Sequence, residues 1–401
     1  MRISTMSPLT QRFHVLDAWR GVAALLVALE RLHANGFFYN LPIVRNSYLF
    51  VDFFFVLSGF VIAHAYGAKL DGMKPAAAFA LRRFGRLWPL HMLLLAMFVA
   101  FEAVKLALSL KGVAMDVPPF SGTSSPATIL TNIALVHGLN LYEVLTWNQP
   151  SWSISDEFWT YLLFAAVCVV GARRLSLWST MLSLAALLTL ILVAPRGMDS
   201  TYDFGILRCI AGFFAGVVTQ RLWQRAGSAV RSRVMAWSAW LEPLMILAVI
   251  VFVSAAGRGP LAFLAPFVFS AMVFVLAFES GPVSRLMTGR VFQALGAWSY
   301  SIYMVNYFVV LMVERLVNSA QRELGTSLIE TVAVNGQPKA LYAFGPAGAM
   351  DAMAVAYLAA VLALSFLTYT LCEAPARRFF NRQADRLEQR AKPRQLAGAC
   401  A

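Results

Sequence analysis

Residues 47–66 read SYLFVDFFFVLSGFVIAHAY, a run of mostly apolar and aromatic residues in which Asp52 is the one Asp, Glu, Lys or Arg. A helix of about 20 apolar residues crosses the hydrocarbon core of a bilayer, because each residue adds about 1.5 Å along the axis. The stretch therefore predicts a transmembrane helix. A carboxylate is costly in lipid, so we expect Asp52 to pair with an arginine of a neighbouring helix.

The rest of the chain is also rich in apolar residues and poor in charged ones. Of its 401 residues, 59% are hydrophobic and 13% are charged, whereas soluble domains carry about 25% charged residues. We therefore predict an all-α, polytopic membrane protein with ten transmembrane helices in a membrane domain of residues 1–380, followed by a basic cytoplasmic tail of residues 381–401. The predicted helices are residues 16–34, 47–66, 88–109, 152–171, 175–195, 204–223, 236–256, 261–280, 295–316 and 350–371.

The distribution of charge predicts the orientation. The 33 Lys and Arg residues are concentrated in segments that lie on one side if the helices alternate, and such segments face the cytoplasm. Both termini are then cytoplasmic, and no cleavable signal peptide is expected. Residues 110–151 and 317–349 become long outer loops. The net charge of +13 follows this pattern and not that of a nucleic-acid-binding helix, so we expect no nucleic-acid partner. The four scattered cysteines predict no disulfide framework and no metal site.

Charged residues inside the first predicted helix are the strongest sign of a functional site. Asp17, Arg20 and Arg31 fall within about 60° of one another on a helical wheel, and Arg31 lies about 16 Å beyond Arg20. His33 falls on nearly the opposite face. Asp17 and Arg20 could instead form an interfacial pair with arginine snorkelling, which would leave Arg31 without a partner.

Two further segments carry candidate binding groups. Arg83 and Arg86 are three residues apart on a helix, so both guanidinium groups face one side and could bind a phosphate. By spacing alone, an ordinary positively charged cytoplasmic anchor is the favoured interpretation of the pair. At the start of the helix over 152–171, Glu157 could pair with an arginine or hold a hydroxyl-bearing substrate, whereas Asp156 could be a solvated cap residue.

Six motifs occur in a recognisable order. They are LDAWRG (16–21), FVDFFFVLSGFVI (50–62), RRFGRLWP (82–89), PSWSISDEFWTYL (150–162), LGAWSYSIYM (295–304) and the closing Glu373-Ala374-Pro375. From about residue 14 to residue 380 the chain resembles the membrane-bound acyltransferase-3 family, in its single-domain form. The resemblance implies about ten helices and transfer of an acyl group from acyl-CoA to a carbohydrate hydroxyl.

The resemblance carries over to individual residues. The family's arginine in the first helix matches Arg20, its Arg-x-x-Arg pair matches Arg83 and Arg86, and its glutamate matches Glu157. Two positions depart from the pattern, because Arg31 and Asn306 stand where the family has histidines. Arginine stays protonated in proteins, so Arg31 cannot act as the general base that a neutral imidazole would be.

These observations predict a membrane O-acyltransferase of the bacterial inner membrane that acetylates a polysaccharide or another carbohydrate outside the cytoplasm. Acetyl-CoA or another acyl-CoA would be a co-substrate, with no permanently bound cofactor. Arg20, Arg31 and Glu157 would be catalytic. Arg83 and Arg86 would hold the donor phosphates, and Asp17, Asp52 and Asn306 would complete the substrate site. The alternative is a non-catalytic transporter or sensor, which the two missing histidines favour.

Overall fold

The computed structural model describes residues 12–334, 337–346 and 348–389. Its first part comprises α1 (His14–Arg31), α2 (Phe37–Asn40), α3 (Pro42–Arg45), α4 (Phe50–Tyr66) and α5 (Met73–Leu110). Its middle part comprises α6 (Ile129–Ile133), α7 (Trp152–Gly171), α8 (Leu175–Val193), α9 (Gly205–Arg225) and α10 (Ser228–Ala256). Its last part comprises α11 (Ala265–Leu276), α12 (Pro282–Met287), α13 (Arg290–Leu324), β1 (Ile329–Val334), β2 (Gln337–Tyr342), α14 (Ala349–Thr368) and α15 (Ala374–Gln389).

The chain is an all-α polytopic membrane protein, as predicted. Each of the ten predicted segments coincides with helical structure. Among the described residues, seven helical stretches are long and apolar enough to cross a membrane, and one of these contains both α7 and α8. α1 is not among the seven, and α11 is a shorter apolar helix. The number of ten crossings therefore stays a prediction.

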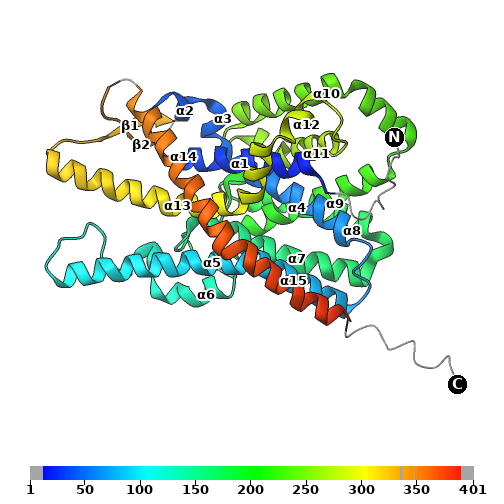
Figure 1. The fold of residues 1–401 in the computed structure, drawn as a ribbon, viewed down its shortest axis with the longest axis horizontal. Coiled ribbons are helices and arrows are strands. Elements are labelled where there is room, and N and C mark those ends of the chain that lie inside the picture. The colour runs from blue at the N-terminus through cyan, green and yellow to red at the C-terminus, as the bar shows by residue number, and fades with distance from the viewer. Residues whose placement is uncertain (1–11, 335–336, 347, 390–401) are drawn as a thin grey trace.

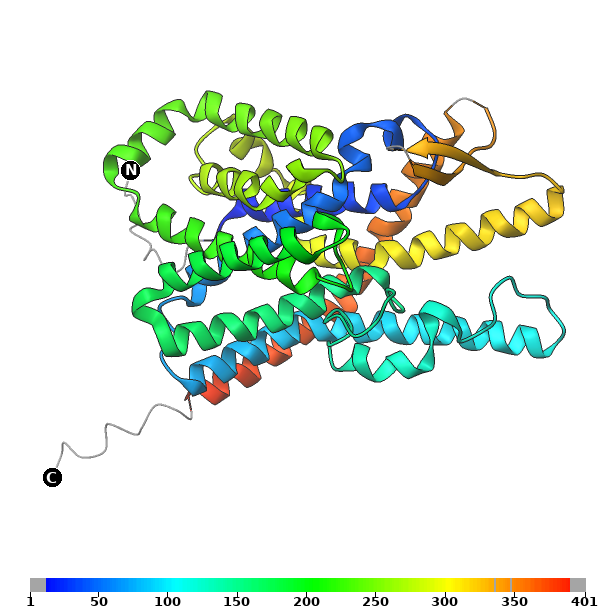
Figure 2. The same ribbon diagram turned by 180° about the vertical axis from the view of Figure 1, so that it is seen from behind.

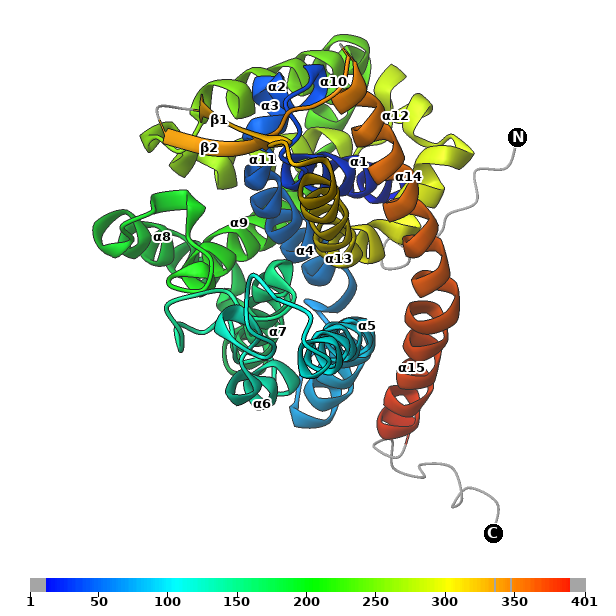
Figure 3. The same ribbon diagram turned by 90° about the vertical axis from the view of Figure 1, so that its left-hand side faces the viewer.

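The long helices run along the long axis of the molecule, with the β-hairpin at one end (Figure 1). Seen from that end, α1, α4 and α13 lie near the middle, with α14 and α15 on one side and α8 and α9 on the other (Figure 3). The reverse view shows the green helices α8 and α9 lying beside each other (Figure 2).

Glycines bring the central helices together. A Cβ added to Gly21 of α1 would come within 2.5 Å of the Leu295 backbone in α13. Between α4 and α9, a Cβ on Gly59 would lie 1.8 Å from the carbonyl oxygen of Phe213, and one on Gly216 would lie 1.9 Å from that of Val56. Small residues allow helices to pack this closely within a membrane.

Asp52 pairs with an arginine of a neighbouring helix, which confirms the prediction for its partner. Arg208 of α9 donates from Nε to Asp52 Oδ1 at 2.8 Å and from Nη2 to Oδ2 at 2.7 Å. Both side chains are fully buried. Arg208 also donates to the backbone oxygens of Tyr48 and Ser200, so the pair joins α4 and α9 to the segments that precede them.

Two predicted boundaries differ from the structure. The outer segment 317–349 was expected to be a loop, but α13 continues to Leu324 and an antiparallel hairpin of β1 and β2 follows. The basic tail was expected to begin at residue 381, but that position lies inside α15. α15 packs against α5, because Arg82 forms ion pairs with Asp385 and Glu388. The rest of the predicted tail, residues 390–401, lies outside the described residues.

Candidate functional site

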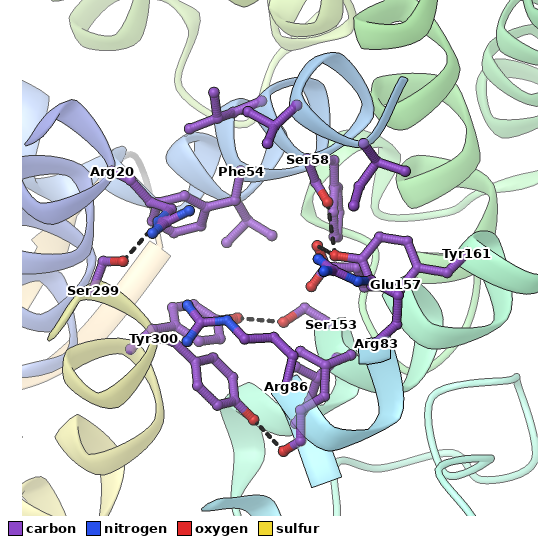
Figure 4. A pocket seen from close by; sticks show the side chains of 18 residues that line it. Arg20, Phe54, Ser58, Arg83, Arg86, Ser153, Glu157, Tyr161, Ser299 and Tyr300 are labelled. Carbon is purple, nitrogen blue, oxygen red and sulfur yellow. Dashed lines mark hydrogen bonds between the residues drawn. The ribbon is translucent and has the colours of Figure 1, made fainter. Parts of the chain in front are cut away.

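A pocket with an empty volume of about 820 Å³ lies between α1, α4, α5, α7 and α13 (Figure 4). Four predicted site residues line it, namely Arg20, Arg83, Arg86 and Glu157. They come from three helices, α1, α5 and α7, and only the fold brings them together.

The walls of the pocket differ in polarity. α4 contributes most of the apolar wall, including Phe54, Leu57 and Val61. α5, α7 and α13 contribute arginines, hydroxyl groups and one carboxylate. The pocket can therefore hold a ligand with an apolar portion on one side and polar groups on the other.

Arg83 is the cation in this pocket that has no carboxylate partner among the described residues. Its guanidinium lies 5.5 Å from the ring centroid of Tyr66, 5.9 Å from that of Phe79 and 6.0 Å from that of Tyr161. Its Nε has no hydrogen-bond partner within the described part of the chain. Aromatic faces hold the cation in place without neutralising it, so Arg83 is available to an anion.

Arg86 is paired instead. Its Nη1 donates to the carboxylate of Glu373, which is buried and also accepts a hydrogen bond from Ser301 Oγ at 2.8 Å. The guanidinium lies 5.2 Å from the ring centroid of Tyr300. Glu373 closes a π-helical segment, Tyr369–Glu373, between α14 and α15, and such segments are frequent at functional sites. The sequence indicated Glu373 through its motif but gave it no role.

Arg20 is oriented by groups on two helices. Its Nε donates to Ser299 Oγ at 2.7 Å and its Nη2 donates to the backbone oxygen of Gly296 at 3.2 Å. Asp17 Oδ1 lies 3.4 Å from Nη2 of Arg20, and Asp17 also pairs with Arg12. Asp17 is not among the residues that line the pocket. Asp17 therefore helps to position the guanidinium of Arg20 from outside the pocket.

Glu157 belongs to a hydrogen-bonded group of three residues (Figure 4). Tyr161, one turn later on α7, donates its hydroxyl to Glu157 Oε1 at 2.5 Å. The hydroxyl groups of Tyr161 and Ser58 lie 2.8 Å apart. Neither Ser58 nor Tyr161 was predicted as a site residue. Tyr161 follows Glu157 by four residues, a spacing that places two side chains on the same face of a helix and could have indicated this contact. Ser58 lies on another helix, and no sequence spacing relates it to Glu157.

The neighbouring Asp156 is not the solvated cap residue that the sequence allowed. Its side chain is fully buried, and neither carboxylate oxygen has a hydrogen-bond partner in the described structure. A Cβ on Gly205 would lie 2.5 Å from Asp156 Oδ2, and one on Gly138 would lie 2.7 Å from Oδ1. The helix begins at Trp152, so Asp156 already lies inside it and faces α9.

The entrance to α7 is fixed by a histidine in the preceding loop. His137 Nε2 lies 2.9 Å from Ser151 Oγ, and its ring stacks on that of His91 at 5.3 Å between centroids. Burial lowers the pKa of His137 to about 3, with a smaller contribution from His91. The imidazole is therefore neutral near pH 7, where it holds the segment that leads to Glu157.

Besides Asp17, three further predicted residues lie outside the pocket. Asp52 is engaged by Arg208, as described above. Asn306 is fully buried and donates from Nδ2 to the backbone oxygens of Ile302 and Tyr303 on its own helix. Arg31 does not line the pocket. Its Nε lies 3.6 Å from Glu30 Oε2 and has no hydrogen-bond partner in the described chain.

The helical wheel does not extend to His33. α1 ends at Arg31, and the next residue, Leu32, is extended, with φ −83° and ψ 98°. The ring of His33 then packs edge-on against that of Tyr39, at 5.8 Å between centroids. The expected position of His33 on the opposite face of a continuous helix was therefore wrong.

Comparisons with known proteins agree with the resemblance seen in the motifs. A family model described as an acyltransferase domain matches residues 13–372. Acyltransferase MdmB of Streptomyces mycarofaciens is 24% identical over 404 residues, which cover 94% of this chain and 95% of that protein. Protein 2 in picA locus of Rhizobium radiobacter is 36% identical over 189 residues, which cover 46% of this chain and 95% of that protein. No solved structure matches.

Proposed function

Because the chain belongs to the acyltransferase domain family and is thus a transferase of acyl groups, we propose that it is a membrane O-acyltransferase that uses acyl-CoA. The donor enters from the cytoplasm, and the acceptor is a hydroxyl group of a carbohydrate outside it. Acetyl is the acyl group we favour. The enzyme would then be a multi-pass protein of a bacterial inner membrane.

The observation that carries this proposal is the unpaired Arg83 at one end of the pocket. CoA carries phosphate groups on a long pantetheine arm, and an arginine without a carboxylate partner binds phosphate through charged hydrogen bonds. Arg86 is already paired with Glu373. We therefore assign the phosphate contact to Arg83, and we assign Arg86 to holding α5 against the segment that ends at Glu373.

The remaining residues suit the chemistry of acyl transfer. The acceptor oxygen would attack the thioester carbonyl, so that a C–O bond forms, the C–S bond breaks and the CoA thiolate leaves. Glu157 would take the proton from the attacking hydroxyl, and Tyr161 would orient its carboxylate. Arg20, held by Ser299 and Gly296, would stabilise the negative charge that develops on the carbonyl oxygen.

Arg31 takes a secondary place in this scheme. It lies about 16 Å along α1 from Arg20 and close enough to Tyr303 and Tyr357 to act on them electrostatically. We assign it to the outer approach of the acceptor and not to proton transfer, since a guanidinium stays protonated. Glu157 then supplies the base that α1, with Arg31 at the position of the family's histidine, does not supply.

The decisive experiment uses the full-length protein purified in detergent with acetyl-CoA that carries label in the acetyl group. An O-acyltransferase should release CoA and transfer or hydrolyse the labelled acetyl group. A transporter or sensor on the same scaffold would bind the label without breaking the thioester. Binding without any CoA release, with carbohydrate acceptors present, would contradict the proposed reaction.

Arg83 provides a specific test of the donor site. Arg83→Ala should weaken CoA binding by about 1.5–3 kcal/mol, the cost of losing a hydrogen bond to a charged group. Arg173→Ala removes the same charge from an exposed position away from the pocket and should leave CoA affinity unchanged. Affinity would be measured by calorimetry or by fluorescence competition. Equal affinities for both variants and the parent protein would remove Arg83 from the donor site.

A further inference from the structure

The β-hairpin is joined to the segment that follows α1. The amide of Tyr342 in β2 donates to the backbone oxygen of His33 at 2.7 Å, and the amide of Asn35 donates to the backbone oxygen of Tyr342 at 2.8 Å. Lys339, three residues earlier on β2, lies over α2, with its Nζ 5.4 Å from the ring centroid of Tyr39. The hairpin and α2 lie at the end of the molecule away from the start of α1 and the end of α15 (Figure 1). In the proposed topology this end is the outer one.

Three cations from distant parts of the chain meet there. The charged groups close enough to act on the Lys339 ammonium are Arg31, Arg258, Glu30 and Asp199. Arg258, between α10 and α11, donates to Asp199 at 2.7 Å, and the Nε of Arg31 lies 3.6 Å from Glu30. Lys339 forms no ion pair with a carboxylate of the described chain. We call Arg31, Arg258 and Lys339 the outer cations. Two carboxylates serve all three of them.

Two buried donors in the same region also have no partner. The Nε of Arg31 and the hydroxyl of Tyr39 are buried and form no hydrogen bond with any described group. Tyr39 is only 2% exposed, and its hydroxyl lies within electrostatic range of Glu30 and Arg258. Buried polar groups normally have a hydrogen-bond partner. Unpartnered donors beside a lysine without a carboxylate therefore indicate a site for an anion.

We propose that the outer cations and the hydroxyl of Tyr39 bind an anionic group of the acceptor, a carboxylate or a phosphate. The acceptor is then a carbohydrate that carries such a group. This inference rests on the proposed O-acyltransferase activity. Hydrogen bonds from Lys or Arg to a carboxylate or phosphate are stronger than those between neutral groups, and the Tyr39 ring holds Lys339 without neutralising it.

Arg31 relates this anion site to the pocket. It acts electrostatically on Tyr303, which lines the pocket, and also on Lys339 of the hairpin. An acceptor whose anionic group is held by the outer cations would therefore lie beside the pocket. Its hydroxyl groups could then reach toward the acyl donor.

The experiment measures binding of small sugars to the full-length protein in detergent, without acyl-CoA. The probes are glucuronate, glucose 1-phosphate and uncharged glucose, compared by saturation-transfer NMR. At least one anionic sugar should bind more tightly than glucose by roughly tenfold or more, as expected from a hydrogen bond to a charged group. This preference should fall when the salt is raised from about 50 mM to about 500 mM, because salt screens charges. The anionic sugar that is preferred shows whether the site takes a carboxylate or a phosphate.

Variants of the outer cations test which residues carry the preference. Lys339→Met and Arg31→Met should each lower the affinity for the anionic sugar by roughly tenfold and leave that for glucose unchanged. Lys339→Arg keeps the charge and should keep most of the preference. Lys111→Met is the matched control, because Lys111 is exposed at the end of α5 on the same predicted side of the membrane. It should leave the preference unchanged. If Lys339→Met does not fold, Lys339→Gln replaces it.

Three results would overturn the anion site. They are equal affinities of the parent protein for charged and uncharged sugars, no binding of any of the three, and equal effects of Lys339→Met and Lys111→Met. CoA release from labelled acetyl-CoA is measured separately. A protein that breaks the thioester but shows no preference for anionic sugars would contradict this inference alone. A protein that prefers anionic sugars but never releases CoA would contradict the proposed reaction and leave the anion site in place.

Discussion

Three arginines within five residues of α5 have different environments, although their side chains are chemically identical. Arg82 is bound to Asp385 and Glu388 of α15, and Arg86 is bound to the buried Glu373. Arg83 is surrounded by aromatic rings. Because a buried charge needs a partner, the paired arginines stabilise the helix contacts and the remaining one is left for a ligand.

Arg86 should therefore behave as a structural residue. Arg86→Ala leaves the carboxylate of Glu373 buried without its cation, and removing one partner of a buried pair costs about 3–5 kcal/mol. We expect a large fall in the thermal midpoint of the protein in detergent. The double variant Arg86→Met with Glu373→Gln should recover much of it, because neither charge is left unpaired.

A different result would contradict the structural role of Arg86. If Arg86→Ala kept its thermal midpoint but lost CoA affinity, then Arg86 would be a phosphate ligand and its contact with Glu373 would be incidental.

At the scale of elements, the site depends on how closely the helices pack. α4 supplies the apolar wall and Ser58, and its position is set by the contacts of Gly59 and Gly216 with the facing backbone of α9. The buried pair of Asp52 and Arg208 fixes the same two helices at their other end. Both features act on the position of α4 and not on any ligand directly.

Gly59→Ala tests this arrangement. The added Cβ would lie 1.8 Å from the backbone oxygen of Phe213, so α4 and α9 must separate. Overpacking of this kind typically costs about 1–3 kcal/mol, and we expect at least that loss, seen as a lower thermal midpoint and weaker CoA binding. Gly227→Ala is the matched control, since no heavy atom lies within 4 Å of its added Cβ. Equal midpoints for the two variants would show that the α4–α9 contact is looser than described.

At the scale of the whole molecule, α1 begins and α15 ends toward the same end of the long axis (Figure 1). The β-hairpin and the far ends of α5 and α13 lie at the opposite end. This arrangement agrees with two termini on one side of the membrane. The excess of Lys and Arg in the predicted cytoplasmic segments makes that side the cytoplasm in our proposal.

Reporter fusions test the orientation. Reporters placed after Ala226 and Gly289 should show cytoplasmic activity, because both positions lie in segments on the predicted cytoplasmic side. Reporters after Ser124 and Gly257 should show external activity. Alkaline phosphatase, which is active only outside the cytoplasm, and a fluorescent protein that matures inside it give opposite readouts at each site. A reversed pattern at all four positions would invert the proposed membrane topology and with it the side from which the donor enters.

The sequence by itself determined the helices, because the length and apolarity of each run decide whether a helix can cross a membrane. It also determined that Asp52 needs a cationic partner, and its motifs selected Arg20, Arg83, Arg86 and Glu157, which the fold gathers in one pocket.

Only the tertiary structure decided which of these charged side chains have an ion-pair partner and which are available to a ligand. The partner of Arg86 is 287 residues away in the sequence, and no local pattern indicates that contact. No local pattern indicates that α1 ends at Arg31, so that His33 lies outside the helix. None indicates that α15 packs on α5 either. The physical reason is that local sequence sets helix formation, whereas the availability of a buried charge depends on every element packed around it.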